Sequence, residues 1–270
     1  GALVVAHQVT NTGANNINLT GVGIDLSTTN SDVGSGTGII TIDAGTGLFN
    51  MASGSSVATT TADIDVSSDT IALAGLIQTT TVGEISLAPD TASTVISLGA
   101  GATTGFALTD AELNTLDATI VRIGDATTGA PWGGASTGAI TWTGAFAADS
   151  AFATDLLALT TTSTVTGTAG VIDLSTSTSD LVIRGASSGV DLGTAAHDFN
   201  TITISSTGSV TVNDTDDLTI GTVDGLSGIG AGTSQIDVTA GGLLTVSQTV
   251  ANSTASAISL AGVGINLDNG

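Results

Sequence analysis

The stretch Ile17–Leu26, INLTGVGIDL, returns almost unchanged near the other end of the chain as Ile258–Leu267, ISLAGVGINL. Sliding the sequence by 241 positions pairs residues 1–29 with residues 242–270 without a gap, and thirteen of the twenty-nine pairs are identical. Self-similarity at a fixed period is typical of repeat architectures. We therefore expect one continuous unit over 1–270 whose two ends are equivalent parts of a 241-residue repeat. Both copies should adopt the same strand–turn–strand shape.

A shorter signature recurs inside this unit: a β-branched residue, an Asp or Ser, then an apolar residue. It begins at Ile24, Ile42, Ile64 and Ile85, which lie 18, 22 and 21 positions apart, and it returns in the second half of the chain. These spacings predict an imperfect unit of about twenty residues. Apolar residues alternate with polar ones in runs such as Thr201–Ser205, TITIS. Alternation with period two indicates a strand with one buried face.

The composition favours an all-β protein. The chain has no Lys, Cys or Tyr; its basic side chains are Arg122, Arg184 and two histidines, and its glutamates are Glu84 and Glu112. Long helix-forming side chains are therefore scarce, whereas β-branched Thr, Val and Ile are abundant. The hydrophobic fraction of 41% argues against disorder, because disordered chains lack the apolar residues that offset the entropy of ordering.

Short strands in a repeating unit favour a right-handed parallel β-helix, a β-solenoid with coils of about twenty residues. Such coils stack at about 4.8 Å, so about thirteen of them would form a rod on the order of 60 Å long. The inward positions would be Ile, Val, Leu and Ala. A string of β-sandwich modules is the alternative, but hairpin folds favour Asn-Gly or Asp-Gly turns. Inside the chain such a turn occurs once, at Asp224–Gly225.

Two segments interrupt the pattern and predict short helical or irregular excursions. In Gly105–Asp125, Thr109 and Glu112 have the spacing of a capping box, which predicts one or two helical turns followed by a strand over Thr119–Gly124. Ala145–Leu159 has apolar residues at helical spacing and is either a short helix or an irregular coil. Pro131–Gly134 predicts a turn.

The two indoles, Trp132 and Trp142, have two interpretations. We expect them to form a local hydrophobic plug over an irregular coil; stacking on carbohydrate is the less favoured alternative.

The charge restricts the partners. A net charge of −22 leaves no basic stripe to neutralise phosphates, which argues against nucleic acid and against an anionic membrane surface. No run of eighteen apolar residues is present, so we expect no membrane insertion. We see no basic-then-apolar leader at Gly1 and expect any signal peptide to be removed or to lie outside this segment. The absence of Cys excludes a disulfide scaffold and is compatible with an exported protein.

Residues 105–146 resemble a known family. FALTDAELNTLDATIVRIGDATTGA (106–130) followed by AITWTGAF (139–146) is similar to the large filamentous-haemagglutinin-like exoproteins, bacterial surface and secreted adhesins typically exported by a two-partner (type V) route. The resemblance implies an internal segment of a right-handed β-helix shaft, extracellular placement, and roles in adhesion, aggregation or biofilm formation. The family's Asn-Pro-containing secretion motif is not visible in this sequence.

The sequence predicts no catalytic, cofactor-binding or metal-binding residues. Polysaccharide lyases need Lys or Arg near the substrate carboxylate, and Arg122 and Arg184 are separated by 62 positions, roughly three coils. His197–Asp198 has no Gly-x-Ser-x-Gly elbow to act on, so we expect His197 to be a partly exposed turn residue. Asn213–Asp217 carries oxygen ligands that suit calcium, but a solvated acidic turn is the favoured interpretation. The pairs Thr141/Thr143 and Thr201/Thr203 are too scattered for an ice-binding array.

These observations predict a structural and adhesive extracellular rod, a segment of a large repetitive cell-surface adhesin. The alternative is a self-assembling subunit of an extracellular filament or sheath, and a polysaccharide-active β-helix enzyme is the second alternative. The expected partners are other copies or adjacent repeats stacked end to end, and glycans or proteins of host or neighbouring cells.

Overall fold

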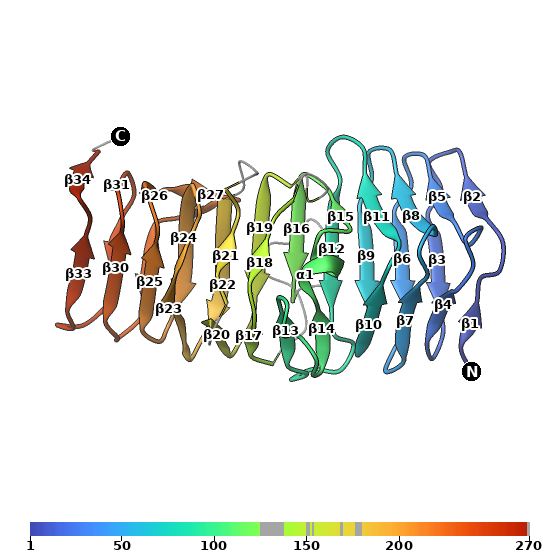
Figure 1. Cartoon of the computed structure of the whole chain (residues 1–270), viewed down its shortest axis with the longest axis horizontal. Coiled ribbons are helices and arrows are strands. Elements are labelled where there is room, and N and C mark those ends of the chain that lie inside the picture. Colours follow the sequence, from blue (N-terminus) through green and yellow to red (C-terminus); the bar gives the residue numbers. More distant parts are fainter. Residues whose placement is uncertain (125–137, 150–151, 153, 168–169, 176–179, 269–270) are drawn as a thin grey trace.

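The chain winds into a parallel β-solenoid of about 10 turns with about 24 residues per turn. The computed structural model describes residues 1–124, 138–149, 152, 154–167, 170–175 and 180–268. Strands lie side by side along the long axis, and the two termini lie at opposite ends (Figure 1). The predicted all-β solenoid is therefore confirmed. At about 4.8 Å per turn the rod is on the order of 50 Å long.

Three faces surround the core, and each consists of stacked strands. Face one is a single 13-stranded sheet. Its strands are β3 (Ile17–Thr20), β6 (Ile40–Asp43), β9 (Ile64–Ser67), β12 (Glu84–Ala88), β16 (Ile120–Ile123), β19 (Leu156–Thr160), β22 (Asp180–Ala186), β24 (Thr201–Ser206), β26 (Leu218–Ile220), β29 (Ile229–Ala231), β31 (Leu243–Val246), β32 (Val250–Ala251) and β34 (Gly264–Leu267).

Face two joins a four-stranded and an eight-stranded sheet, which meet where β10 lies beside β14. Its strands are β1 (Leu3–Val4), β4 (Ile24–Leu26), β7 (Leu48–Met51), β10 (Thr70–Leu73), β13 (Ile96–Leu98), β14 (Phe106–Leu108), β17 (Ile140–Trp142), β20 (Thr164–Gly167), β23 (Gly189–His197), β25 (Val210–Asp214), β30 (Ile236–Ala240) and β33 (Ile258–Ala261).

Face three is shorter and consists of a five-stranded sheet followed by a two-stranded sheet. Its strands are β2 (Val9–Asn11), β5 (Val33–Ser35), β8 (Ser56–Thr59), β11 (Leu76–Thr79), β15 (Leu116–Asp117), β18 (Phe146–Ala147) and β21 (Ile172–Asp173). A small hairpin of β27 (Thr222–Val223) and β28 (Leu226–Ser227) stands apart from the three faces.

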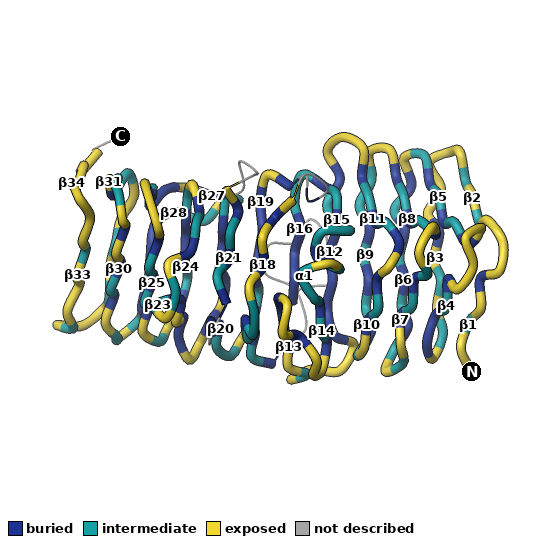
Figure 2. The backbone as a smooth tube through the Cα atoms, in the orientation of Figure 1, coloured by how far each residue is buried: buried dark blue, intermediate teal, exposed yellow. Residues whose placement is uncertain are grey.

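The core is a set of aliphatic ladders, because equivalent positions of successive coils stack in register. On face one, Ile17, Ile40, Ile64 and Ile85 follow one another in a single column. All four are buried, whereas Asn18, Thr41 and Asp65, which alternate with the ladder positions, are more exposed. Figure 2 shows buried and more exposed segments alternating along the tube. Burying one such side chain stabilises the fold by about 1.5–3 kcal/mol. The alternation read from the sequence is therefore the inward–outward alternation of the strands.

The predicted coil length and number are wrong. Ile24 lies on face two and Ile42 on face one, so their spacing of 18 does not measure a coil. The true register pairs Ile42 with Val66, 24 positions further on. The signature occurs on strands of all three faces, such as β9, β4 and β21, because it reports only that a strand has an inner and an outer side.

The two copies of the repeated stretch share their strand–turn–strand form but not their face. In the first copy β3 lies on face one and β4 on face two; in the second copy β33 lies on face two and β34 on face one. Gly23 has a φ of +94° in the turn, whereas Gly264 already belongs to β34. The second copy is thus displaced by one face around the rod. The 241-residue array itself stays a prediction.

The first interruption contains the expected helix. The helix α1 (Asp110–Leu113) begins after Thr109, and Thr109 and Glu112 form a complete capping box. The strand expected over Thr119–Gly124 is β16. Within the described part of the chain no helix is long and apolar enough to cross a membrane.

The second interruption is a coil and contains no helix in its described residues. Ala145–Leu159 contributes β18 and the start of β19. In β19, Leu157 and Leu159 point into the main core while Leu156 and Ala158 belong to a second apolar cluster outside it. A strand buried on both sides has a continuous apolar run, which periodicity alone does not distinguish from a helix.

Trp142 lies inside the solenoid and does not cover it. Its side chain is fully buried in β17, 6.0 Å from the ring of Phe146, which in turn packs edge-on against Phe152 at 5.1 Å. The expected plug is therefore an aromatic layer of the core, and Trp142 presents no surface to a carbohydrate. Trp132 and Pro131–Gly134 lie outside the described residues.

Candidate functional site

The most distinctive local feature is the hairpin of β27 and β28. It is the only antiparallel pair among the described strands. Its two-residue loop is Asp224–Gly225, with φ values of +50° and +74°. Positive φ at both loop residues defines a type I′ turn, which strongly prefers Asp-Gly. Gly228 N–H donates to the Gly221 carbonyl at 2.8 Å and closes the hairpin at its base.

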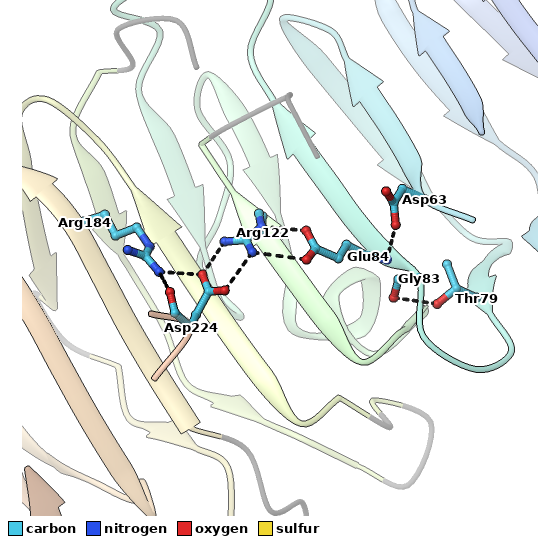
Figure 3. Close-up of polar contacts among 7 residues, drawn as sticks. All are labelled: Asp63, Thr79, Gly83, Glu84, Arg122, Arg184 and Asp224. Atoms are coloured by element: carbon cyan, nitrogen blue, oxygen red, sulfur yellow. Dashed lines mark hydrogen bonds and ion pairs between the residues drawn. The ribbon is translucent and has the colours of Figure 1, made fainter. Parts of the chain in front are cut away.

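The tip of this hairpin brings both arginines of the chain together. Asp224 Oδ2 accepts hydrogen bonds from Arg122 Nη1 at 2.7 Å and from Arg184 Nη2 at 2.6 Å (Figure 3). On its other side the Arg122 guanidinium donates from Nε to Glu84 Oε2 at 2.8 Å. Glu84, Arg122 and Arg184 come from β12, β16 and β22 of face one. We call Glu84, Arg122, Arg184 and Asp224 the clamp.

An apolar patch on the outer side of face one holds the rest of the hairpin. Leu156, Ala158 and Val182 cluster there with Val223 of the hairpin, and Ile120 and Leu226 pack against them. Outer positions elsewhere on this face are largely polar, such as Asn18, Thr41 and Asp65. The hairpin thus folds back over β16, β19 and β22, and the paired side chains of Glu84 and Asp224 are only 18% and 16% exposed.

The electrostatics of the clamp favour a fixed ion-pair network. The side chains of Arg122 and Arg184 are 5% and 0% exposed. Burial alone would raise the pKa of Asp224, but hydrogen bonds and charges of the two arginines outweigh it and lower that pKa. Burial likewise works against the charged form of Arg122, yet its bonds to Asp224 and Glu84 raise its pKa overall. An aspartate held ionised in this way suits pairing and not general-acid chemistry.

Sequence reasoning missed this site for a physical reason. Arg122 and Asp224 are 102 positions apart, and no local pattern reports a contact over that distance. The arginines, expected three coils apart, are two strands apart on face one because β19 alone lies between β16 and β22. The available signal was the single internal Asp-Gly pair, which marks the hairpin but not its partners.

A second polar cluster lies at the corner after β23. His197, expected to be partly exposed, is fully buried there. Its Nδ1 accepts from the Ile172 N–H at 3.0 Å, and its ring stacks on Phe199 at 5.4 Å. Burial lowers the pKa of His197 to about 4, so the imidazole is neutral at pH 7.

Thr215, Asp216 and Asp217 of the expected solvated turn are exposed, but Asp214 at the same corner is buried. Its carboxylate accepts from the Phe199 N–H at 2.9 Å and the Asp216 N–H at 3.2 Å. Burial, with smaller contributions from Asp216 and Asp198, raises the pKa of Asp214 to about 7 against the effect of these hydrogen bonds. Asp217 Oδ1 accepts from the Leu243 N–H at 2.6 Å. In the described residues no group of three or more His, Cys, Asp or Glu is placed to hold a metal ion.

The threonine pairs lie on different faces and form no common array. Thr141 belongs to β17 on face two, whereas Thr201 and Thr203 belong to β24 on face one. Thr203 is fully buried and donates to the Gly228 carbonyl at 2.7 Å.

We expect Asp198→Asn to stabilise the protein at neutral pH. The pKa of Asp198 is raised by burial and by the charges of Asp216 and Asp173, so the folded state holds the proton of Asp198 more tightly than the unfolded state does. Wild-type stability should therefore fall as pH rises above about 4. Removing the charge should add about 0.5 kcal/mol at pH 7.5 and low salt.

Thermal melting at pH 7.5 and at pH 3 checks this, because Asp198 is protonated at pH 3 in both folded and unfolded states. The gain should vanish at pH 3 and shrink in 1 M salt. A gain that is equal at both pH values would show that charge repulsion is not the cause.

No family model matches the chain, and searches of the curated proteins and of the solved structures find no match. The parallel β-helix repeat fold that residues 105–146 imply by resemblance is the fold observed. Membership of the filamentous-haemagglutinin-like exoproteins stays a prediction.

Proposed function

We propose that the protein is a structural rod, a shaft segment of a large repetitive cell-surface adhesin of the filamentous-haemagglutinin-like type. The observation that carries the proposal is the stack of parallel coils itself. Backbone hydrogen bonds and aliphatic ladders run along the rod axis, so each coil is braced by its neighbours. Such a rod transmits force along its length and holds whatever is attached to its ends apart.

The polar groups of the chain support a structural role. Both arginines are engaged in the clamp, and the corner carboxylates Asp214 and Asp217 accept bonds from backbone N–H groups. These charged groups therefore brace one coil against another. An acidic surface with a net charge of −22 keeps rods apart laterally.

Antibodies against the purified chain test the placement. On intact cells of the source they should label the surface. Labelling that appears only after the cells are permeabilised would contradict the adhesin proposal. Turnover of acidic polysaccharides by the purified chain would favour the enzyme alternative instead.

End-to-end self-assembly is the second candidate function, and it would use the exposed ladder side chains of the last described coil. Ile258, Ile265 and Leu267 continue the inner ladders of Ile236, Leu244 and Val246, yet they are 43%, 48% and 68% exposed. A coil stacked on these side chains, whether from a second copy or from further repeats of the same chain, would bury them and pair with the backbone groups of β33 and β34.

Sedimentation velocity of matched variants tests this stacking. If rods associate, Ile265→Asp should abolish association, because it places a charge in the ladder. Val263→Asp should leave association unchanged, because Val263 lies in the turn and is already 87% exposed. Wild-type protein that stays monomeric at every concentration would rule out the filament and leave the single-chain shaft.

A further inference from the structure

The hairpin of β27 and β28 is an insertion into a strand of face one. The strands on either side of it, β26 and β29, both pair with β24. The last residue of β26 pairs with Ile202, and the first residue of β29 pairs with Ile204. In β24 only Thr203 lies between these two partners, whereas residues 221–228 lie between β26 and β29. The hairpin is therefore additional chain at a point where the ladder needs a single residue.

Two glycines close the insertion and keep the ladder intact. Gly221 N–H donates to the Ile202 carbonyl at 3.3 Å, and the Gly228 carbonyl accepts from the Ile204 N–H at 3.0 Å. Together the two glycines make the pair of bonds that one residue opposite Thr203 would make. Among the described strands, β27 and β28 pair only with each other. The hairpin can therefore leave face one without breaking a ladder bond of the coils.

The surface under the hairpin is built to hold one carboxylate. Without the hairpin, the clamp retains two cations, Arg122 and Arg184, and one anion, Glu84. Asp224 supplies the single negative charge that balances them, and its Oδ2 lies between the two guanidinium groups (Figure 3). The balance suits a monoanion and would be overshot by a dianion.

The aliphatic side chains on either side of Asp224 complete the fit. Val223 precedes the turn and Leu226 follows it, and both pack in the apolar cluster that contains Leu156 and Val182. The carboxylate thus lies between two aliphatic groups and not at the end of one. A straight acyl chain carries its carboxylate at one end, so a protein turn matches this surface better.

We propose that the outer surface of β16, β19 and β22 is a binding site for an acidic turn of a partner protein, with the hairpin as its built-in occupant. A matching turn presents one carboxylate between two aliphatic side chains. Opening of the hairpin at Gly221 and Gly228 exposes the site while the coils stay paired. Because the occupant is tethered, it competes at a high effective concentration, and a free partner binds the closed protein weakly.

Deleting residues 222–228 tests the proposal, because Gly221 then stands alone opposite Thr203 in a continuous strand. The probe is a cyclic peptide that carries residues 222–227, and isothermal titration calorimetry measures its binding. The deletion variant should bind the peptide at least about tenfold more tightly than the wild type, whose own hairpin fills the site. A folded deletion variant that does not bind the peptide, or that binds it no better than the wild type does, would overturn the proposal.

Matched probes establish what the site recognises. The peptide carrying Asp224→Asn should bind the deletion variant at least about tenfold more weakly, because the charge pairs are lost. Arg184→Met in the deletion variant should weaken binding of the unaltered peptide by a similar factor. Equal affinity for the two peptides would contradict recognition of a carboxylate. Octanoate bound as tightly as the peptide would assign the surface to acyl chains and overturn its assignment to a protein turn.

A point variant keeps the test decisive if the deletion variant does not fold. Asp224→Gly retains the hairpin, leaves a gap for one carboxylate between the guanidinium groups, and tolerates the φ of +50° at this position. Relative to equal chloride at pH 7, acetate should fill the gap and raise the Tm of this variant by about 2–4 °C more than that of the wild type. Asp237→Ala, on face two, should respond as the wild type does. A folded Asp224→Gly protein without this additional gain would likewise overturn the proposal.

Discussion

Replacing Asp224 by Ala should lower the free energy of unfolding by about 3–5 kcal/mol, because it removes the carboxylate that two buried guanidinium groups share. Asp224 serves both arginines, and Arg184 has a side chain with no exposed surface. Urea denaturation at pH 7 measures the loss. A loss below about 1 kcal/mol, the range of a surface ion pair, would contradict the clamp as described.

Acid pH provides an internal check on this variant. The pKa of Asp224 is lowered in the folded state, so its stabilising contribution is fully present above the unfolded value near 4 and is lost as pH falls through the folded value. The difference between wild type and Asp224→Ala should therefore narrow at pH 2–3. Asp237→Ala on face two serves as the control: this carboxylate is in none of the ion pairs of the described residues, so it should change stability by less than about 0.5 kcal/mol.

Replacing Phe146 by Ala should cost about 3–5 kcal/mol through the cavity it leaves. Phe146 is fully buried between Trp142 and Phe152 and links the two rings. In a Trp132→Phe background, which leaves Trp142 as the single indole, water reaching the cavity should also shift the fluorescence emission of Trp142 to longer wavelength. Chemical denaturation and emission spectra measure the two effects.

Phe146→Leu is the matched control, because it keeps most of the volume and should lose less than half as much. An emission spectrum that stays unchanged in Phe146→Ala would show that the aromatic layer does not shield Trp142.

The sequence predicts the architecture well because the architecture is local. Inward–outward alternation marks each strand, and the Thr109–Glu112 capping box identifies α1. The coil length was misjudged because Ile24 and Ile42 carry the same signature on different faces. The clamp could not be predicted, since the contact of Arg122 with Asp224 depends on how many coils intervene between them.

The second misjudged segment has a local cause. Leu156–Leu159 reads as an apolar run because the hairpin buries the outer side of β19. A strand that is covered on both sides loses its alternation of apolar and polar residues. The apolar run therefore indicates that the outer face of this strand is covered as well as its inner face. The hairpin with the Asp224–Gly225 turn is the element that covers it. The apolar run and the Asp-Gly pair predict this contact only when they are considered together.

Pulling a single molecule by its two ends is the most direct test of the structural-rod proposal. A rod must resist force along its axis, and the clamp should need the highest force to break. Coils beyond the clamp should peel away in steps of about one coil. Release of the clamp should then free the segment from Arg122 to Asp224, which are 102 positions apart, in one step on the order of 350 Å. This large step should disappear in Asp224→Ala. Uniform coil-sized steps from end to end in the wild type would contradict the account.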